Sequence, residues 1–158
     1  MKSFIRTLAL AAATLWVASA QAGTRIGNEY CEDLFSGSTC SAGICILYSA
    51  AATPTDAYVR IKHVACDAST LASNPLITAR LQVWNGVPNT SGATVLKQLT
   101  VRVPQPSVAS SNNYYSIDSD ALFLVGAGRY IALYLGLSGS AGMGVNYCGV
   151  TGDLVTPQ

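Results

Sequence analysis

Apolar and polar side chains alternate along several segments of this chain, and that period of two is the feature that most limits its fold. In residues 77–84, ITARLQVW, every odd-numbered side chain is apolar. A period of two places alternate side chains on opposite faces of a strand, whereas an amphipathic helix repeats every 3.6 residues. Residues 77–84 are therefore predicted to form a strand with one buried and one wetter face.

Other segments extend the same prediction. Alternation recurs in residues 58–65, 96–103 and 129–137, and short apolar runs occupy residues 43–49, 121–125 and 144–150. Joints rich in Gly, Pro, Asn and Ser, which favour turns, separate these segments. Only residues 67–72 offer a place for a short helical turn. We expect an all-β fold, a single antiparallel β-sandwich or jelly roll of about seven to eight strands.

The amino-terminal residues have the order of a secretory signal peptide. Lys2 and Arg6 precede a short apolar run at residues 8–17, and small residues follow at Ala18, Ala20 and Ala22. The run is shorter than the roughly 20 residues that a membrane-spanning helix needs. We expect residues 1–22 to be a signal peptide of bacterial type that is cleaved after Ala22, and the mature protein to be secreted or periplasmic.

The predicted mature chain is one domain, residues 23–158, with a cysteine-rich segment at residues 23–45. The mature chain keeps all five cysteines, which are Cys31, Cys40, Cys45, Cys66 and Cys148. An exported protein meets an oxidising compartment, so disulfides are expected, and an odd number leaves one thiol over. We expect Cys31 to pair with Cys40 or Cys45, and Cys66 with Cys148. The remaining thiol is either buried and inert, bridged to a second molecule, or, least in keeping with export, a metal-binding or catalytic group.

Charge and histidine content exclude several classes of function. Charged residues make up 11% of the chain, and the formal net charge is +1. Loss of Lys2 and Arg6 leaves 7 basic against 8 acidic residues. This balance offers no basic surface for nucleic acid and predicts no nucleic-acid partner. After removal of the signal, no membrane span is expected either, because Arg129 and three glycines interrupt the apolar stretch at residues 121–137.

His63 is the single histidine, so zinc sites with several histidines and iron sites with two cannot be built. Alternation places His63 on the same side of its strand as Val59 and Ile61, which favours a structural role. Asp118 and Asp120 form an Asp-Ser-Asp sequence in a segment rich in Ser and Asn. They are interpreted as turn residues or, less favourably, as part of a calcium site, which needs six to eight oxygen ligands. No cofactor, catalytic residue or metal site is predicted.

Aromatic residues are the most suggestive candidates for ligand binding. The chain has eight tyrosines. Aromatic rings supply contact area at low entropic cost, although tyrosine also favours strands for reasons of packing alone. The candidate ligand-binding residues are Trp84, Tyr114, Tyr115, Tyr130 and Tyr134. By alternation, Tyr130 and Tyr134 share one face of their strand, opposite Ile131, Leu133 and Leu135.

Three functions are compatible with these features. The first is an exported, non-catalytic module that binds a protein or a glycan. The second is a structural or assembly subunit of the cell envelope or of a surface fibre, which self-associates through an unpaired cysteine or a poorly guarded strand edge. The third is a small hydrolase that uses His63 or a pair of carboxylates. The scarcity of acid–base groups favours the first.

Overall fold

The computed structural model describes residues 23–36 and 40–156, and all of the regular secondary structure in these residues is β-strand. The strands are β1 (Thr24–Ile26), β2 (Glu29–Ser36), β3 (Ile44–Ser49), β4 (Tyr58–Leu71), β5 (Leu76–Trp84), β6 (Val95–Val101), β7 (Ser107–Ala109), β8 (Asn112–Val125), β9 (Tyr130–Leu137) and β10 (Met143–Val155).

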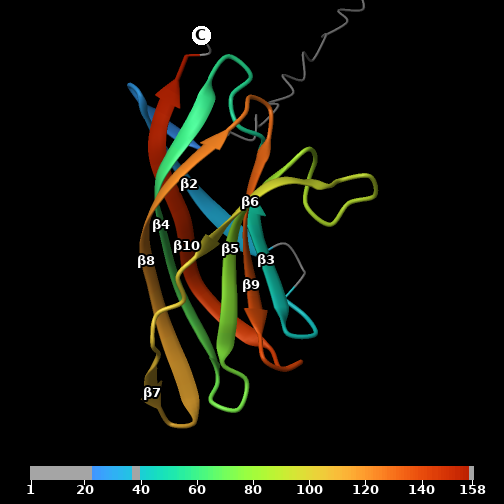
Figure 1. Cartoon of the computed structure of the whole chain (residues 1–158), viewed down its shortest axis with the longest axis vertical. Helices are drawn as coiled ribbons and strands as arrows, with labels where there is room; N and C mark the ends of the chain where they lie inside the picture. The colour runs from blue at the N-terminus through green and yellow to red at the C-terminus, as the bar shows by residue number, and fades with distance from the viewer. Residues whose placement is uncertain (1–22, 37–39, 157–158) are drawn as a thin grey trace, which may run out of the picture.

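The ten strands form one antiparallel sheet that curls into a half-barrel (Figure 1). Their order is β6-β5-β9-β3-β2-β10-β4-β8-β7, and β1 pairs with β2. Strand β2 joins the two halves of the sheet, because its first part pairs with β10 and its last three residues pair with β3. The predicted all-β antiparallel class is confirmed. A sandwich or jelly roll is not clearly formed, because one continuous path of paired strands links both halves.

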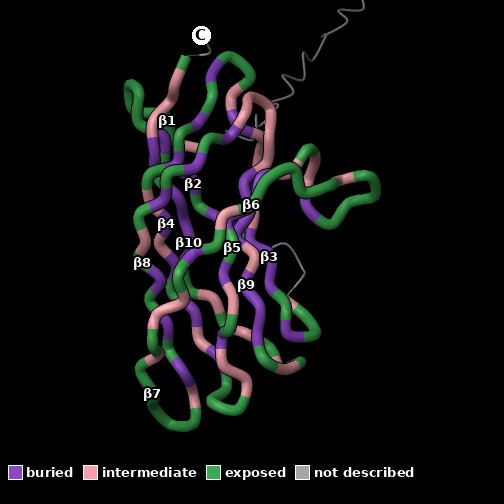
Figure 2. The backbone as a smooth tube through the Cα atoms, viewed as in Figure 1, coloured by how far each residue is buried: buried purple, intermediate pink, exposed green. Residues whose placement is uncertain are grey.

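The concave side of the sheet holds the core. Figure 2 shows buried positions recurring along the strands, as alternation requires. The largest fully buried side chains are Tyr30, Phe123, Leu47, Ile61, Leu81, Ile117, Ile131, Leu133, Leu135, Val59, Val64 and Val125. They come from β2, β3, β4, β5, β8 and β9, so the curl brings side chains from most of the long strands against one another.

Three strands are longer than the sequence predicts, and one of them is β10, which extends to Val155 beyond the predicted residues 144–150. Strand β4 continues through residues 67–71, where a short helical turn was expected, and β8 begins at Asn112, ahead of the predicted residues 121–125. The helical prediction at residues 67–72 is therefore wrong for residues 67–71. Both edges of β4 are paired there, Asp67 with Ser116 of β8 and with Tyr147 of β10. Backbone hydrogen bonds from two neighbours outweigh a local preference for a turn.

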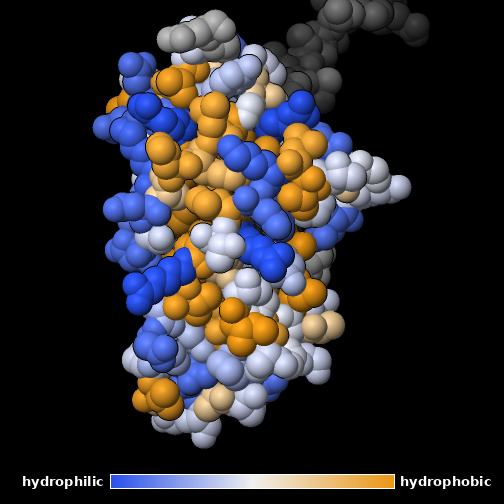
Figure 3. All heavy atoms as spheres, viewed as in Figure 1, coloured by the Kyte–Doolittle hydropathy of each residue, from blue (hydrophilic) through white to orange (hydrophobic). Residues whose placement is uncertain are grey.

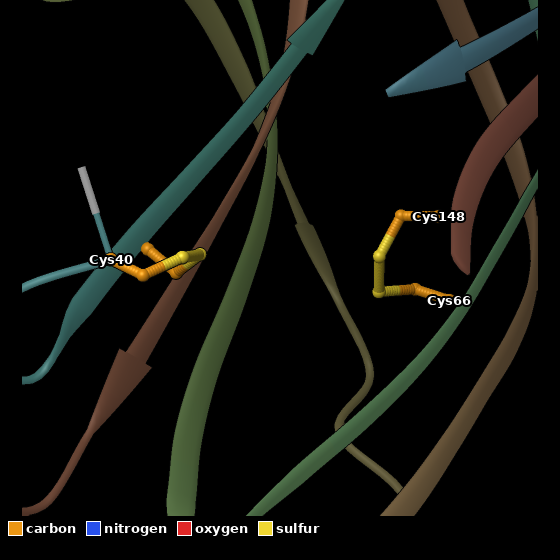
Figure 4. Close-up of a disulfide and its surroundings, with 4 residues drawn as sticks. Cys40, Cys66 and Cys148 are labelled. Atoms are coloured by element: carbon orange, nitrogen blue, oxygen red, sulfur yellow. A yellow bond between two sulfur atoms is a disulfide. The ribbon is translucent and has the colours of Figure 1, made fainter. Parts of the chain in front are cut away.

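Two disulfides cross-link the chain (Figure 4). Cys66 and Cys148 face each other across β4 and β10, which confirms that predicted pair. Cys40 pairs with Cys45, and Cys31 is a free, exposed thiol. The expected pairing of Cys31 with Cys40 or Cys45 is thus wrong. Cys31 lies on the outer side of β2, whereas Cys45 is buried on the inner side of β3.

In the described part of the chain there is no helix of the length and apolarity needed to cross a membrane. The predicted signal peptide, residues 1–22, lies outside the described residues, as do residues 37–39 of the cysteine-rich segment.

Candidate functional site

Three of the predicted aromatic residues meet on the outer face of the β5–β9 pair. Trp84 of β5 lies opposite Tyr130 of β9, and Arg80 of β5 lies opposite Tyr134 of β9. The residues between them, such as Leu81 and its partner Leu133, point into the core. The strict period of the strand therefore sends the aromatic and the aliphatic side chains to opposite faces.

Polar contacts hold these side chains in place. The indole Nε1 of Trp84 donates a hydrogen bond to Gln82 Oε1 at 3.1 Å. The guanidinium carbon of Arg80 lies 5.9 Å from the centre of the Tyr134 ring, within the range of a cation–π contact. Tyr134 also lies beside Gly136, because a Cβ atom built there would be 3.3 Å from Tyr134 Cε1. The Tyr134 ring therefore lies beside both Arg80 and Gly136.

Two outer-face positions between the rings are buried. Gln82 and Ala132 belong to the outer face, yet Gln82 is only 6% exposed and Ala132 is fully buried. Tyr48 of β3 lies opposite Ala132 and extends the aromatic surface onto a third strand. We call Tyr48, Trp84, Tyr130 and Tyr134, with Arg80 and Gln82, the aromatic face. Its four aromatic residues are each of intermediate exposure, so part of each side chain is accessible.

The chemistry available on the aromatic face is stacking and hydrogen bonding. Indole and phenol rings present flat apolar surfaces, and Gln82, Arg80 and the tyrosine hydroxyls supply donors and acceptors. Strands β3, β5, β6 and β9 contain no Asp or Glu. A glycosidase needs a pair of carboxylates beside the bond that it breaks, and these four strands supply none.

The other two aromatic candidates lie elsewhere. Tyr115 is 3% exposed, and its hydroxyl accepts a hydrogen bond from the backbone N–H of Leu76 at 3.0 Å. Tyr115 is thus a core residue that joins β8 to the start of β5, and it is not available to a ligand in this structure. Tyr114 is exposed on the outer side of β8, away from β5 and β9 in the strand order.

Sequence reasoning missed three members of the aromatic face. Arg80 and Gln82 share the parity of Trp84 in residues 77–84, so alternation could have assigned them to the same face. Tyr48 could not be assigned in this way, because only the pairing of β3 with β9 brings it beside Ala132.

His63 lies on the outer side of β4, not on the side of Val59 and Ile61 as predicted. A register shift between Ile61 and His63 reverses the alternation at this point, and the His63 side chain is about one-third exposed. Its Nε2 lies 3.2 Å from Asp118 Oδ1, and its Nδ1 lies 3.5 Å from Asp120 Oδ1. Both ring nitrogens face carboxylates, so neither is directed at a serine hydroxyl as a catalytic triad requires.

Asp118 and Asp120 belong to strand β8, so their interpretation as turn residues is wrong. They pair with β4 at Ala65 and His63. Within the described residues, no group of three or more His, Cys, Asp or Glu side chains is arranged to hold a metal ion. Calcium binding by the two aspartates therefore receives no support from this arrangement.

A third carboxylate, that of Asp153, is paired with cations. Asp153 Oδ2 of β10 lies 2.7 Å from Arg60 Nη2 and 2.6 Å from Lys62 Nζ, both of β4. The hydrogen bonds from Lys62 and Arg60 lower the pKa of Asp153 below its ordinary value. The carboxylate thus stays ionised and links β4 to β10 near neutral pH, which suits a structural role.

An apolar groove runs beside the last residues of β8. Its volume is about 500 Å³, and its lining includes Tyr58, Lys97, Leu122 and Leu124. Leu122 is 82% exposed. Strand β7 pairs only with Asn112–Tyr114 of β8, so among the described residues the end of β8 is paired in the sheet with β4 alone. Lys97 of β6 packs over the Phe123 ring there, 4.8 Å from its centre. Figure 3 shows hydrophobic residues gathered on the face where β6 passes in front of the sheet.

No protein-family model matches this chain, and no curated protein or solved structure is significantly similar to it.

Proposed function

We propose that this protein is an exported, non-catalytic binding module that holds a glycan on its aromatic face. The observation that carries the proposal is that Trp84, Tyr130 and Tyr134 share one outer surface. Arg80 lies opposite Tyr134 on that surface, and Gln82 lies between Arg80 and Trp84. Stacked rings beside polar side chains suit a sugar, which has apolar C–H faces and hydroxyl groups around its edge.

Anchoring of the rings supports binding by this surface. Trp84 donates a hydrogen bond to Gln82, and Tyr134 lies beside Arg80 and Gly136. A side chain that is already ordered loses less entropy when a ligand docks on it. The absence of Asp and Glu from β3, β5, β6 and β9 supports retention of the glycan without its cleavage.

Export is part of the proposal. The two disulfides are consistent with an oxidising, extracellular environment, and the predicted signal peptide would deliver the chain there. A secreted or periplasmic location would also bring the aromatic face into contact with polysaccharides outside the cytoplasm.

Replacing Trp84 with alanine is expected to weaken glycan binding by at least about tenfold, which corresponds to roughly 1.4 kcal/mol. The substitution removes the largest ring of the aromatic face and leaves Gln82 without its indole partner. The measurement is binding of the wild-type and variant proteins to an array of immobilised polysaccharides, followed by calorimetric titration with the best soluble fragment.

The matched control is Tyr114→Ala, which removes an exposed aromatic residue of β8 and should leave glycan binding unchanged. A wild-type protein that binds no polysaccharide, or a Trp84→Ala protein that binds as well as wild type, would contradict the proposal. If Trp84→Ala instead abolished capture of a protein, the same face would be a protein-binding surface.

The second candidate function, a self-assembling envelope or fibre subunit, is favoured by the open end of β8. Residues 121–125 carry no charge, and both Leu122 and Leu124 are exposed there. Charged residues or proline commonly protect such an edge from pairing with another strand, and both are missing from these five residues.

If this edge assembles, Leu122→Lys should convert the protein from oligomer to monomer in sedimentation velocity experiments at high protein concentration. The charge would oppose edge pairing but would cost little stability, because Leu122 is almost fully exposed. The experiment is run with and without reductant, which separates edge pairing from a bridge through Cys31. A wild-type protein that remains monomeric under both conditions removes the support for assembly.

A further inference from the structure

Glu32 of β2 is a buried carboxylate. It lies on the inner side of β2, between Tyr30 and Leu34, and is 5% exposed. No Lys, Arg or His of the described residues forms an ion pair with it. Buried carboxylates are usually paired with a cation, because removing an ion from water costs several kcal/mol.

Three neutral groups donate hydrogen bonds to this carboxylate. The Tyr30 hydroxyl donates to Oε2 at 3.0 Å, and the backbone N–H groups of Ala50 and Gly23 are the other donors. Burial is the main cause that raises the pKa of Glu32 above its ordinary value, and the donors oppose it only in part. The site therefore has hydrogen bonds but lacks positive charge.

Both the backbone conformation and the close surroundings of residue 23 favour glycine. Gly23 has a φ of +48°, a conformation that side chains disfavour. A Cβ atom built on it would lie 2.6 Å from Glu32 Oε2 and 2.7 Å from the Cys31 carbonyl oxygen. The backbone of residue 23 thus rests directly against the carboxylate, and any larger residue would displace one or the other.

We propose that cleavage of the chain between Ala22 and Gly23 creates the missing cation, and that Glu32 is the built-in binding site for the new amino terminus. A processing peptidase adds water across the Ala22–Gly23 bond. Ala22 leaves as a carboxylate, and the proton that its carboxyl group loses is taken up by the Gly23 amine, which becomes an ammonium group. The nitrogen that donates as a neutral amide in the full-length chain then donates as a cation from the same place.

Pairing of this ammonium with Glu32 links the residue before β1 to β2. It also adds a cation to the hydrogen bonds that Tyr30 and Ala50 donate to the carboxylate. Charge-assisted hydrogen bonds are about twice as strong as neutral ones. The folded protein then gains this ion pair only after the predicted signal peptide is removed at this bond. Cleavage at the alternative small-residue site, after Ala20, would place the charge on Gln21, two residues before the Gly23 nitrogen that contacts Glu32.

The test compares four protein forms. One begins at Gly23, one begins at Gln21, and each is also made with Glu32→Gln. In the form that begins at Gly23, the α-amino pKa, followed by NMR of labelled glycine, should lie at least about one pH unit above the ordinary value of roughly 7.7–8.0. The ionisable side chains around the pair are Tyr30, Cys31 and Asp33. A pKa in the ordinary range would overturn the proposal.

Urea unfolding gives the second measurement. The form that begins at Gly23 should have a higher urea midpoint than the form that begins at Gln21, and Glu32→Gln should remove most of that difference. If Glu32→Gln lowered the urea midpoint equally in both forms, the proposal would be overturned. If neither Glu32→Gln protein folds, the α-amino pKa of the wild-type form decides alone.

The third measurement is the mass of the protein after secretion of the full chain from a bacterial host. Gly23 is the expected first residue. A mature protein that begins at Gln21 would contradict the proposed role of Glu32, and it would leave glycan binding by the aromatic face untouched.

Discussion

Replacing both Cys66 and Cys148 with alanine is expected to lower the free energy of unfolding by about 4.5 kcal/mol. The two cysteines are 82 residues apart, and without the bridge the unfolded chain regains the conformational entropy of that long loop. This bridge joins β4 and β10, which are neighbours in the sheet although they are distant in sequence. Urea unfolding monitored by circular dichroism measures the loss. Alanine is chosen because both sulfur atoms are buried and a serine hydroxyl would add an unpaired polar group.

The matched control is removal of the other bridge. Cys40 and Cys45 are separated by 5 residues, so the same entropy estimate gives only about 2 kcal/mol. The two losses should therefore differ by a factor of about two. Equal losses would show that loop length does not govern the contribution of these disulfides.

Leu133→Ala should be the second severe substitution, with a loss of about 3–5 kcal/mol in the free energy of unfolding. Leu133 is fully buried in β9 and is flanked by Leu47 of β3 and Leu81 of β5, which are 1% exposed or less. Three paired strands surround the cavity that the substitution creates, so the site cannot easily collapse.

The same chemical change at Leu122 provides the control. Leu122 is 82% exposed, so Leu122→Ala should change the free energy of unfolding by no more than about 0.5 kcal/mol. Both variants are compared by urea unfolding in the range where the protein is monomeric. Similar losses at the two positions would contradict the placement of the core on the concave side of the sheet.

Seven of the ten strands could be predicted from alternation and apolar runs, because one of their faces meets the core. Strand β2 was missed because Glu32 stands in its inner, otherwise apolar row with Tyr30 and Leu34. Strands β1 and β7 have only three residues each, all exposed, so they carry no pattern of burial. Their strand conformation depends on pairing with β2 and β8.

Parity along a strand predicted part of the candidate site and failed where the strand was irregular. Tyr130 and Tyr134 share the outer face, as their spacing requires. His63 lies on the opposite side from its predicted one, because the irregularity beside it shifts the alternation by one residue. A bulge leaves no reliable trace in the local sequence, since it is stabilised by the neighbouring strand.

By itself, the sequence determined which residues alternate, and hence the antiparallel β class and most of the strands that form the core. It also determined that cysteines are odd in number and that acid–base groups are few. The tertiary structure alone decided that Cys31 is left unpaired, that Tyr115 is buried while Tyr48 joins Trp84, and that Glu32 rests against Gly23. Alternation is a local property of the backbone, whereas these juxtapositions depend on the order of the strands and the curl of the sheet, which arise from contacts between distant parts of the chain.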